Sequence, residues 1–134
     1  MSPTLEMALR LLLATALGAV IGFERERFGK VAGIRTHIII TMGAALYNII
    51  SIYGYEGYAF DVSRIGAGVV AGIGFIGAGV IFRDIRNNGV AGITSAACIW
   101  ISAAVGLAAG AGMYLLSILA TVITVGVLLL PKTR

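Results

Sequence analysis

Charged residues are scarce in this sequence. They make up 12% of its 134 residues, whereas 59% are hydrophobic and the mean hydropathy is +1.00. An ordinary soluble domain carries about 25% charged residues, so a soluble core does not explain this balance. Long uncharged stretches between short charged clusters are instead typical of helices that cross a lipid bilayer.

The sequence has one cysteine, Cys98, and one histidine, His37. A single thiol has neither an intrachain disulfide partner nor a second thiol to share a metal, so we interpret Cys98 as a small packing residue. No nucleophile and base lie at a recognisable spacing, and there is no Walker sequence. We therefore expect no enzymatic activity and no cofactor other than Mg²⁺, which is considered below.

Five apolar segments are each about long enough to cross the hydrocarbon core of a bilayer as a helix. They cover residues 7–23, 37–53, 65–82, 94–109 and 113–130. We predict an all-α membrane protein in which residues 1–134 form one transmembrane domain. The first segment lacks the basic flank and the small-residue cleavage site of a secretory signal, so we expect it to be retained.

The ten Lys and Arg residues lie at the ends of these segments rather than on a soluble face, which argues against a nucleic-acid partner. Eight of them fall on one predicted side of the membrane: Arg25, Arg27, Lys30, Arg35, Arg83, Arg86, Lys132 and Arg134. The positive-inside rule therefore predicts a cytoplasmic C-terminus and, with five spans, an N-terminus outside. The lipid bilayer is the first partner that the sequence implies.

An internal repeat relates the first two predicted spans to the next two. Residues 18–45 align with residues 77–104 at a shift of 59 positions, and eleven of the 28 pairs are identical. The identities include the run VAGI at residues 31–34 and 90–93. Both copies enter the membrane in the same direction, so we predict two parallel helical hairpins about an axis along the membrane normal, followed by a fifth helix.

A hydroxyl residue follows the VAGI run in each copy, where the next helix is expected to start. The side chains of Thr36, and of Thr94 or Ser95, are therefore predicted to cap the free backbone N–H groups of these helix starts.

Glycine is dense in the third predicted span, at Gly66, Gly68, Gly72, Gly74, Gly77 and Gly79. Three of them match a dinucleotide-binding fingerprint, but that fingerprint requires a preceding strand and a later acidic residue in a soluble unit. In lipid, glycines allow close helix packing. Two opposite glycine faces predict that this helix is the centre of the bundle, or that one face meets a second subunit in a homo-oligomer. We expect Gly72→Leu to lower the yield of folded protein.

The first predicted cytoplasmic loop is the densest polar cluster, and its candidate functional residues are Glu24, Glu26, Arg35, Thr36 and His37. Its mixed charge favours an ion-pair network with the third connection. The candidate pairs are Glu24 or Glu26 with Arg83 or Arg86, and Asp84 with Arg25 or Arg35. Mg²⁺ is the alternative ligand of these carboxylates, because it usually binds one or two of them together with water. The two interpretations stay open.

Asp61 and Arg64 lie three positions apart, directly before the third span. Asp61 is suited to the start of a helix, and Arg64 is one turn away, so we favour a structural role for both. Asp61 remains, with Glu24 and Glu26, a candidate for binding Mg²⁺. Asn48 and Ser51, inside the second span, are expected to make interhelical hydrogen bonds.

Three stretches resemble the signature blocks of the MgtC/SapB/YhiD family: GFERERFGKVAGIRTH, FDVSRIGAGVVAGIGFIGAGVIF and GVAGITSAACIWISAAVGLAAGAGMY. They extend from about Ala14 to Tyr114 and combine charged-loop motifs with glycine spacings. The resemblance implies the hydrophobic N-terminal membrane domain of that family. This chain would be a short form without the cytosolic C-terminal domain of virulence-associated members, either naturally or because it is cut after the fifth helix.

The resemblance further implies a bacterial inner-membrane protein linked to magnesium homeostasis, with the F-type ATP synthase as a partner that family members are proposed to restrain. Our first hypothesis is a non-enzymatic regulator that acts through contacts with other membrane proteins or with itself. The second is a transporter of magnesium or another small ion, with Asp61 on one side or Glu24 and Glu26 on the other as entry sites. A purely structural oligomer is the third.

Overall fold

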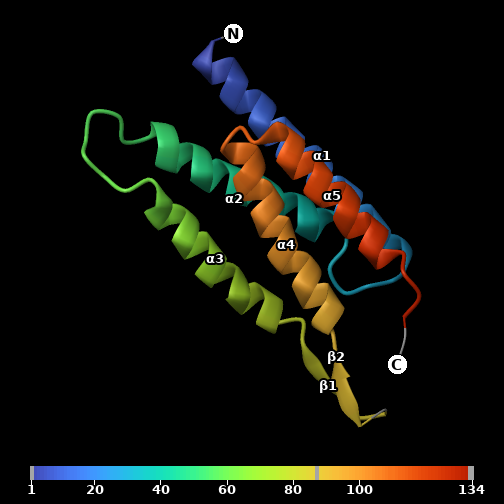
Figure 1. Cartoon of the computed structure of the whole chain (residues 1–134). Coiled ribbons are helices and arrows are strands. Elements are labelled where there is room, and N and C mark those ends of the chain that lie inside the picture. Colours follow the sequence, from blue (N-terminus) through green and yellow to red (C-terminus); the bar gives the residue numbers. More distant parts are fainter. Residues whose placement is uncertain (1, 87, 133–134) are drawn as a thin grey trace.

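The computed structural model describes residues 2–86 and 88–132 of the chain, so Arg134 lies outside the described part. The structure contains five helices and a hairpin of two short strands (Figure 1). The elements are α1 (Pro3–Arg27), α2 (Ile34–Tyr53), α3 (Ser63–Ala78), β1 (Phe82–Asp84), β2 (Gly89–Ala91), α4 (Ile93–Gly110) and α5 (Tyr114–Leu128). The predicted all-α fold with five helices is confirmed.

Three of the helices, α1, α2 and α4, are long and apolar enough to cross a membrane, with 25, 20 and 18 residues. The other two, α3 and α5, are apolar but have 16 and 15 residues. At 1.5 Å per residue they are about 24 and 22 Å long, against a hydrocarbon core of about 30 Å. That α3 and α5 also cross the bilayer therefore stays a prediction.

The helix boundaries differ from the predicted spans by up to four residues. The third span was expected to reach residue 82, but α3 ends at Ala78 because Phe82–Asp84 pair antiparallel with Gly89–Ala91. The first span was expected at residues 7–23, but α1 starts at Pro3, where the Ser2 hydroxyl accepts a hydrogen bond from the Leu5 N–H at 3.2 Å. The same helix continues to Arg27, four residues past the predicted end, so Glu24 and Arg25 are helical.

The repeat seen in the sequence is also present in the packing. The helices α1, α3 and α5 run in one direction, and α2 and α4 run in the other (Figure 1). In the first hairpin, a Cβ on Gly18 would lie 2.7 Å from the His37 carbonyl oxygen; in the second, a Cβ on Gly77 would lie 3.6 Å from that of Ala96. Gly18 and Gly77 are equivalent positions of the repeat, and so are His37 and Ala96, because each pair is separated by 59 positions. The two hairpins therefore pack alike.

A pseudo-two-fold axis passes between α2 and α4. The Asn48 side-chain N–H donates to the Leu107 carbonyl oxygen at 2.6 Å, and these residues are equivalent positions of the repeat. Equivalent positions of parallel helices meet only beside the axis that relates them. The two predicted parallel hairpins and the interhelical hydrogen bond of Asn48 are therefore confirmed.

Two pairs of glycines hold α2 tightly, and neither pair is in the third helix. Gly18 and Gly22 of α1 lie against the α2 backbone on one side, and Gly106 and Gly110 of α4 lie against it on the other. A Cβ on Gly18 would overlap the Thr41 hydroxyl oxygen, and one on Gly106 would overlap the Thr41 carbonyl oxygen. Each pair is spaced as Gly-x-x-x-Gly, which lets helix backbones approach closely in lipid.

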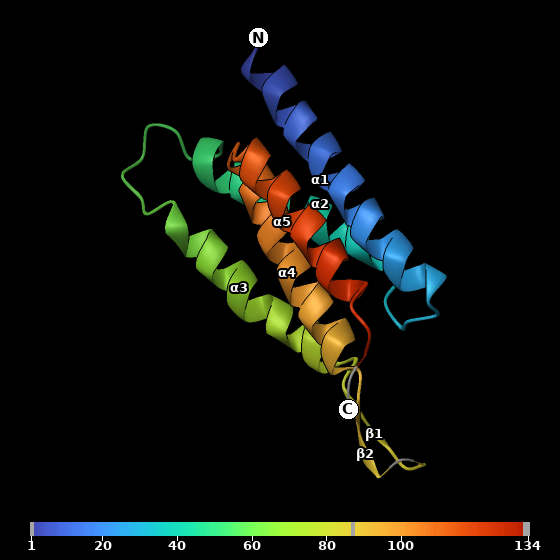
Figure 2. The same cartoon turned by 45° about the vertical axis from the view of Figure 1, so that its right-hand side comes forward.

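The prediction that the third helix is the centre of the bundle is wrong. In both views α3 lies at the edge, packed on α2 and α4 (Figures 1 and 2). A Cβ on Gly66, Gly68, Gly72 or Gly74 would meet no atom within 4 Å, and one on Gly79 would meet only its own helix. Gly77 alone faces a neighbouring helix. Within one chain, most of these glycines are open, and their contact with a second subunit stays a prediction.

The predicted side-chain caps are also absent from both helix starts. The residue that caps α2 is Gly33 and the residue that caps α4 is Gly92, and neither helix start has a side-chain cap hydrogen bond in the described residues. Thr36, Thr94 and Ser95 lie inside the first turns instead. A hydroxyl can cap a helix only from the residue directly before the first turn. That residue is a glycine in both helices, so the hydroxyls lie too far along the chain to act as caps.

Candidate functional site

A buried polar cluster lies where α1 ends and α4 begins. The side chains of Glu24 and Arg25 are almost fully buried in the last turns of α1, although the sequence predicts them in a cytoplasmic loop. Arg25 Nη2 donates to Ser95 Oγ at 3.3 Å, and its Nη1 lies 3.5 Å from Glu24 Oε2. A hydrogen bond from Arg25 therefore connects the end of α1 to the start of α4.

This arrangement differs from the predicted ion-pair network. The ion pair of Glu24 is with Arg25 of its own helix rather than with Arg83 or Arg86. The reason is that α1 continues to Arg27 and turns Glu24 toward the bundle, whereas Arg83 and Arg86 are exposed on the β1–β2 hairpin.

His37 is fully buried in the first turn of α2. Its Nδ1 lies 2.8 Å from Ser102 Oγ, and the Ser102 hydroxyl donates to the Cys98 carbonyl oxygen at 2.7 Å. Because the single proton of that hydroxyl is used, the hydroxyl accepts and His37 Nδ1 donates. The side chain of Cys98 is buried as expected, and this polar chain ties α2 to α4.

The other sequence-predicted residues at this end do not converge on one point. Glu26, Arg35, Thr36 and Thr94 are exposed, and Asp84 is half-buried in β1. Glu26 covers the start of α2, since a Cβ on Gly33 would lie 2.7 Å from Glu26 Oε1. The Asp84 carboxylate accepts a hydrogen bond from the Arg86 backbone N–H at 3.0 Å, which shapes the hairpin turn.

At the opposite end, Asp61 and Arg64 are exposed at the start of α3. Asp61 Oδ1 accepts from the Ser63 hydroxyl at 2.7 Å and from the Ser63 N–H at 2.9 Å. These hydrogen bonds hold the pKa of Asp61 below its usual range. Asp61 lies just before Val62, the cap residue of α3, which makes no side-chain cap hydrogen bond, and its carboxylate instead contacts Ser63, the first residue of the helix. The role of Asp61 stays a prediction.

A magnesium site at the predicted carboxylates is poorly supported by this geometry. In the described part of the chain, no group of three or more His, Cys, Asp or Glu side chains could hold a metal ion. Glu24 lies 3.5 Å from the Arg25 cation, and Asp61 precedes the start of α3, which is at the opposite end of the bundle from the last turns of α1 that carry Glu24 and Glu26 (Figure 1). Binding of Mg²⁺ by one or two carboxylates and water stays a prediction.

An apolar groove opens between α2 and α3, with a volume of about 580 Å³. Its walls include Ile39, Gly43 and Tyr47 from α2 and Gly68, Gly72 and Ile76 from α3. No charged side chain of the described residues lines it. Two of the open glycines of α3, Gly68 and Gly72, thus face a hollow large enough for side chains of another apolar segment.

The MgtC family model matches residues 11–133, nearly the whole chain. The chain belongs to the MgtC family. The protein named "Putative magnesium transporter YhiD" of Escherichia coli (strain K12) is 47% identical over 131 residues, which cover 93% of this chain and 60% of that protein. Protein SrpB of Synechococcus elongatus is 41% identical, covering 90% of this chain and 71% of SrpB, and protein SapB of Bacillus subtilis is 42% identical, covering 81% and 49%.

MgtC family membership confirms the resemblance and, together with the three long apolar helices, a membrane protein. The chain spans about 60% of the length of the YhiD relative and about half of SapB. None of these three relatives is named as an enzyme. No solved structure matches the chain.

Sequence reasoning missed several structural residues of this MgtC family domain. Arg10 was counted only as a charge, yet it is 6% exposed and contacts three other helices. The signal for the glycines of α1 and α4 was present, because Gly18 and Gly22 have the same spacing as Gly106 and Gly110. Ser102 carried no sequence signal, since its role depends on where His37 lies.

Proposed function

We propose that this MgtC family domain is a non-enzymatic membrane regulator linked to magnesium homeostasis, and that it binds a transmembrane helix of another membrane protein in the groove between α2 and α3. The observation that carries the proposal is the groove itself: no charged side chain of the described residues lines it, and a Cβ on any of its glycines, Gly43, Gly68 and Gly72, would meet no described atom within 4 Å.

The pseudo-symmetry of the bundle indicates what shape fits the groove. The helix α5 packs on α1 and α4, where Leu13, Leu17 and Val105 cluster with Ala120 of α5. The two-fold relation exchanges α1 with α3 and α4 with α2. The repeat equivalents of Leu13 and Leu17 are Gly72 and Ile76, and both line the groove. The groove is thus the counterpart of the surface that α5 covers, and an apolar helix is the matching occupant.

The walls of the groove also specify the chemistry of that helix. The position that is Leu13 in α1 is Gly72 in α3. Because glycine has no side chain, the backbone of an incoming helix can approach α3 closely at this point. Because no charged side chain of the described residues faces the groove, the binding face of the partner is apolar and small. The F-type ATP synthase, which the family resemblance implies, is the first partner to test.

Filling the groove is expected to remove the partner while the domain still folds. Gly72→Leu places a side chain in the groove, so we expect the amount of partner that copurifies from native membranes to fall about tenfold. Gly74→Leu is the matched control, because Gly74 is also open but does not line the groove.

Mass spectrometry of proteins cross-linked in the membrane through Gly72→Cys, in a Cys98→Ser background, identifies the occupant. Recovery of a helix from another membrane protein supports the proposal. Recovery of further copies of this chain alone, or equal loss of the partner in the Gly74→Leu control, would contradict it.

Ion transport is the alternative function, because the name of the Escherichia coli relative refers to magnesium transport. The buried Glu24 and His37 also place polar groups between the helices. Under the regulator proposal, proteoliposomes that contain the domain take up Mg²⁺ no faster than empty vesicles. Uptake that is lost in Glu24→Gln, Glu26→Gln or Asp61→Asn, and kept in the exposed control Glu56→Gln, would replace the regulator by a transporter.

We also propose that the end carrying the β1–β2 hairpin faces the bacterial cytoplasm. Seven described cations gather there: Arg25, Arg27, Lys30, Arg35, Arg83, Arg86 and Lys132. The positive-inside rule supports this orientation, with the N-terminus on the outer side of the inner membrane.

A further inference from the structure

A second hollow lies at the hairpin end of the bundle, away from the groove between α2 and α3. It has a volume of about 460 Å³ and is enclosed by the loop after α1, the β1–β2 hairpin, the start of α4 and the segment after α5. We propose that this hollow, called here the anion pocket, binds a phosphate-bearing anion, supplied either by a lipid headgroup or by free phosphate.

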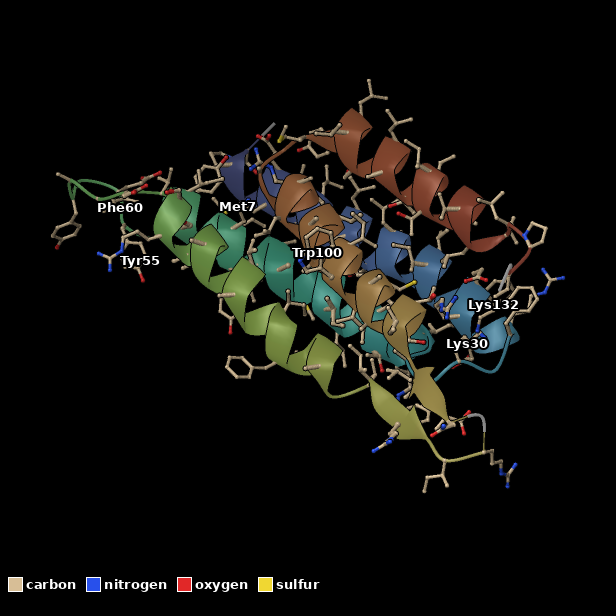
Figure 3. The ribbon with its side chains drawn as sticks, turned by 60° about the horizontal axis from the view of Figure 1, so that its bottom comes forward. Met7, Lys30, Tyr55, Phe60, Trp100 and Lys132 are labelled. Carbon is tan, nitrogen blue, oxygen red and sulfur yellow. The ribbon has the colours of Figure 1, made fainter. Side chains whose placement is uncertain are left out.

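The lining of the anion pocket is predominantly cationic. Among the described residues, Arg25, Lys30 and Lys132 line it, against one carboxylate, that of Asp84. Lys30 and Lys132 come from segments far apart in the sequence, and both lie at the same end of the bundle (Figure 3). Cations brought together in this way repel each other, and a bound anion relieves that repulsion.

The start of α4 forms one wall of the same pocket. Gly92, Ile93, Thr94 and Ser95 line it, and no side chain in the described residues caps this helix of 18 residues. The first N–H groups of a helix lack partners within the helix and carry the positive end of its dipole, so they bind phosphate well. Gly92 has a φ of 90°, and a Cβ there would overlap the Val80 carbonyl oxygen, so the residue directly before α4 has to be glycine.

Arg25 provides an observation that is independent of the helix start. It is 4% exposed, it lines the pocket, and its Nε is buried without a hydrogen-bond partner in the described residues. Its ion pair with Glu24 measures 3.5 Å, longer than a charge-assisted hydrogen bond. A buried guanidinium with an unused donor is costly, and because Arg25 lines the pocket, its guanidinium is a donor for a phosphate bound there.

The chemistry of these donors favours phosphate over a carboxylate or a halide. A phosphate group offers several strong acceptor oxygens, which suit a guanidinium, two ammonium groups and backbone N–H groups together. The pocket also lies where the apolar helices end, at the level at which lipid headgroups are expected. Both sources therefore present the same chemical group to the same residues.

The test uses the whole chain purified in detergent. Inorganic phosphate is titrated by calorimetry, and retention of phosphatidylglycerol against phosphatidylcholine is measured by native mass spectrometry. Because each surface cation contributes about fivefold to binding an anionic lipid, we expect Lys30→Gln with Lys132→Gln to weaken binding at least about tenfold. The control is Arg27→Gln with Arg83→Gln, which removes the same charge from exposed residues that do not line the pocket.

Binding of inorganic phosphate that is lost in the lysine variant assigns the pocket to free phosphate. Selective retention of phosphatidylglycerol that is lost in the same variant assigns it to the lipid headgroup. Equal losses in both double variants show nonspecific attraction and overturn the site, as does binding of neither probe by the unchanged protein.

Discussion

Gly106→Leu is expected to prevent the bundle from assembling. A Cβ at this position would overlap the Thr41 carbonyl oxygen and lie 2.8 Å from the Ala44 Cβ, so the new side chain meets the α2 backbone rather than flexible atoms. Overpacking of this kind costs about 3 kcal/mol or more, because α4 and α2 have to separate along their contact. The loss is measured as the fraction of monodisperse protein after extraction in mild detergent and as the midpoint of thermal unfolding.

Gly72→Leu is the informative comparison, since it makes the same change in the third helix. A Cβ on Gly72 meets no atom within 4 Å, so the structure predicts an unchanged unfolding midpoint for the isolated chain. This expectation reverses the one drawn from the sequence. Equal loss of folded protein in both variants would mean that α3 packs against something essential, such as a second copy of the chain.

Arg10→Gln is expected to loosen the other end of the bundle by about 2 kcal/mol. The Arg10 guanidinium donates to Glu6 Oε1 at 2.8 Å, to the Gly110 carbonyl oxygen at 3.0 Å and to the Tyr114 hydroxyl at 3.3 Å, and it lies 5.4 Å from the centre of the Tyr53 ring. One side chain therefore joins α1 to α2, α4 and the start of α5, and a glutamine reaches fewer of these groups.

The Arg10 effect is measured by thermal unfolding in detergent, with Arg64→Gln as the control at the same end. Arg64 is exposed, and its substitution by glutamine removes the same charge as Arg10→Gln. A lower midpoint in Arg10→Gln alone is the expected result. Equal midpoints in both variants would show that net charge at this end, rather than the contacts of Arg10, is what matters.

Much of the fold could be predicted from the sequence because its signals are local or repeated. Apolar length identified the helices, and the shift of 59 positions predicted two hairpins that the contacts of Gly18 and Gly77 then reproduced. The candidate site was less predictable. The end of the first apolar segment predicts a cytoplasmic loop at Glu24 and Arg25, yet both side chains are buried because α1 continues by one more turn.

The glycines show where sequence reasoning reached its limit. Within the helices, the spacing Gly-x-x-x-Gly occurs at Gly18 and Gly22, at Gly68 and Gly72, and at Gly106 and Gly110. Only the first and third pairs touch α2, while the pair in α3 faces an open groove. Spacing indicates that a helix face permits close approach, but it does not indicate whether another helix is there.

The sequence by itself determined that this chain is a helical membrane protein of the MgtC family with two parallel hairpins, because hydropathy, repeat and motifs are properties of the chain alone. Only the tertiary structure decided that α2 is held between α1 and α4, that α3 lies at the edge, and that Arg25 is buried beside the start of α4. These features depend on how helices distant in sequence cross one another, and that geometry is set by packing rather than by any local pattern.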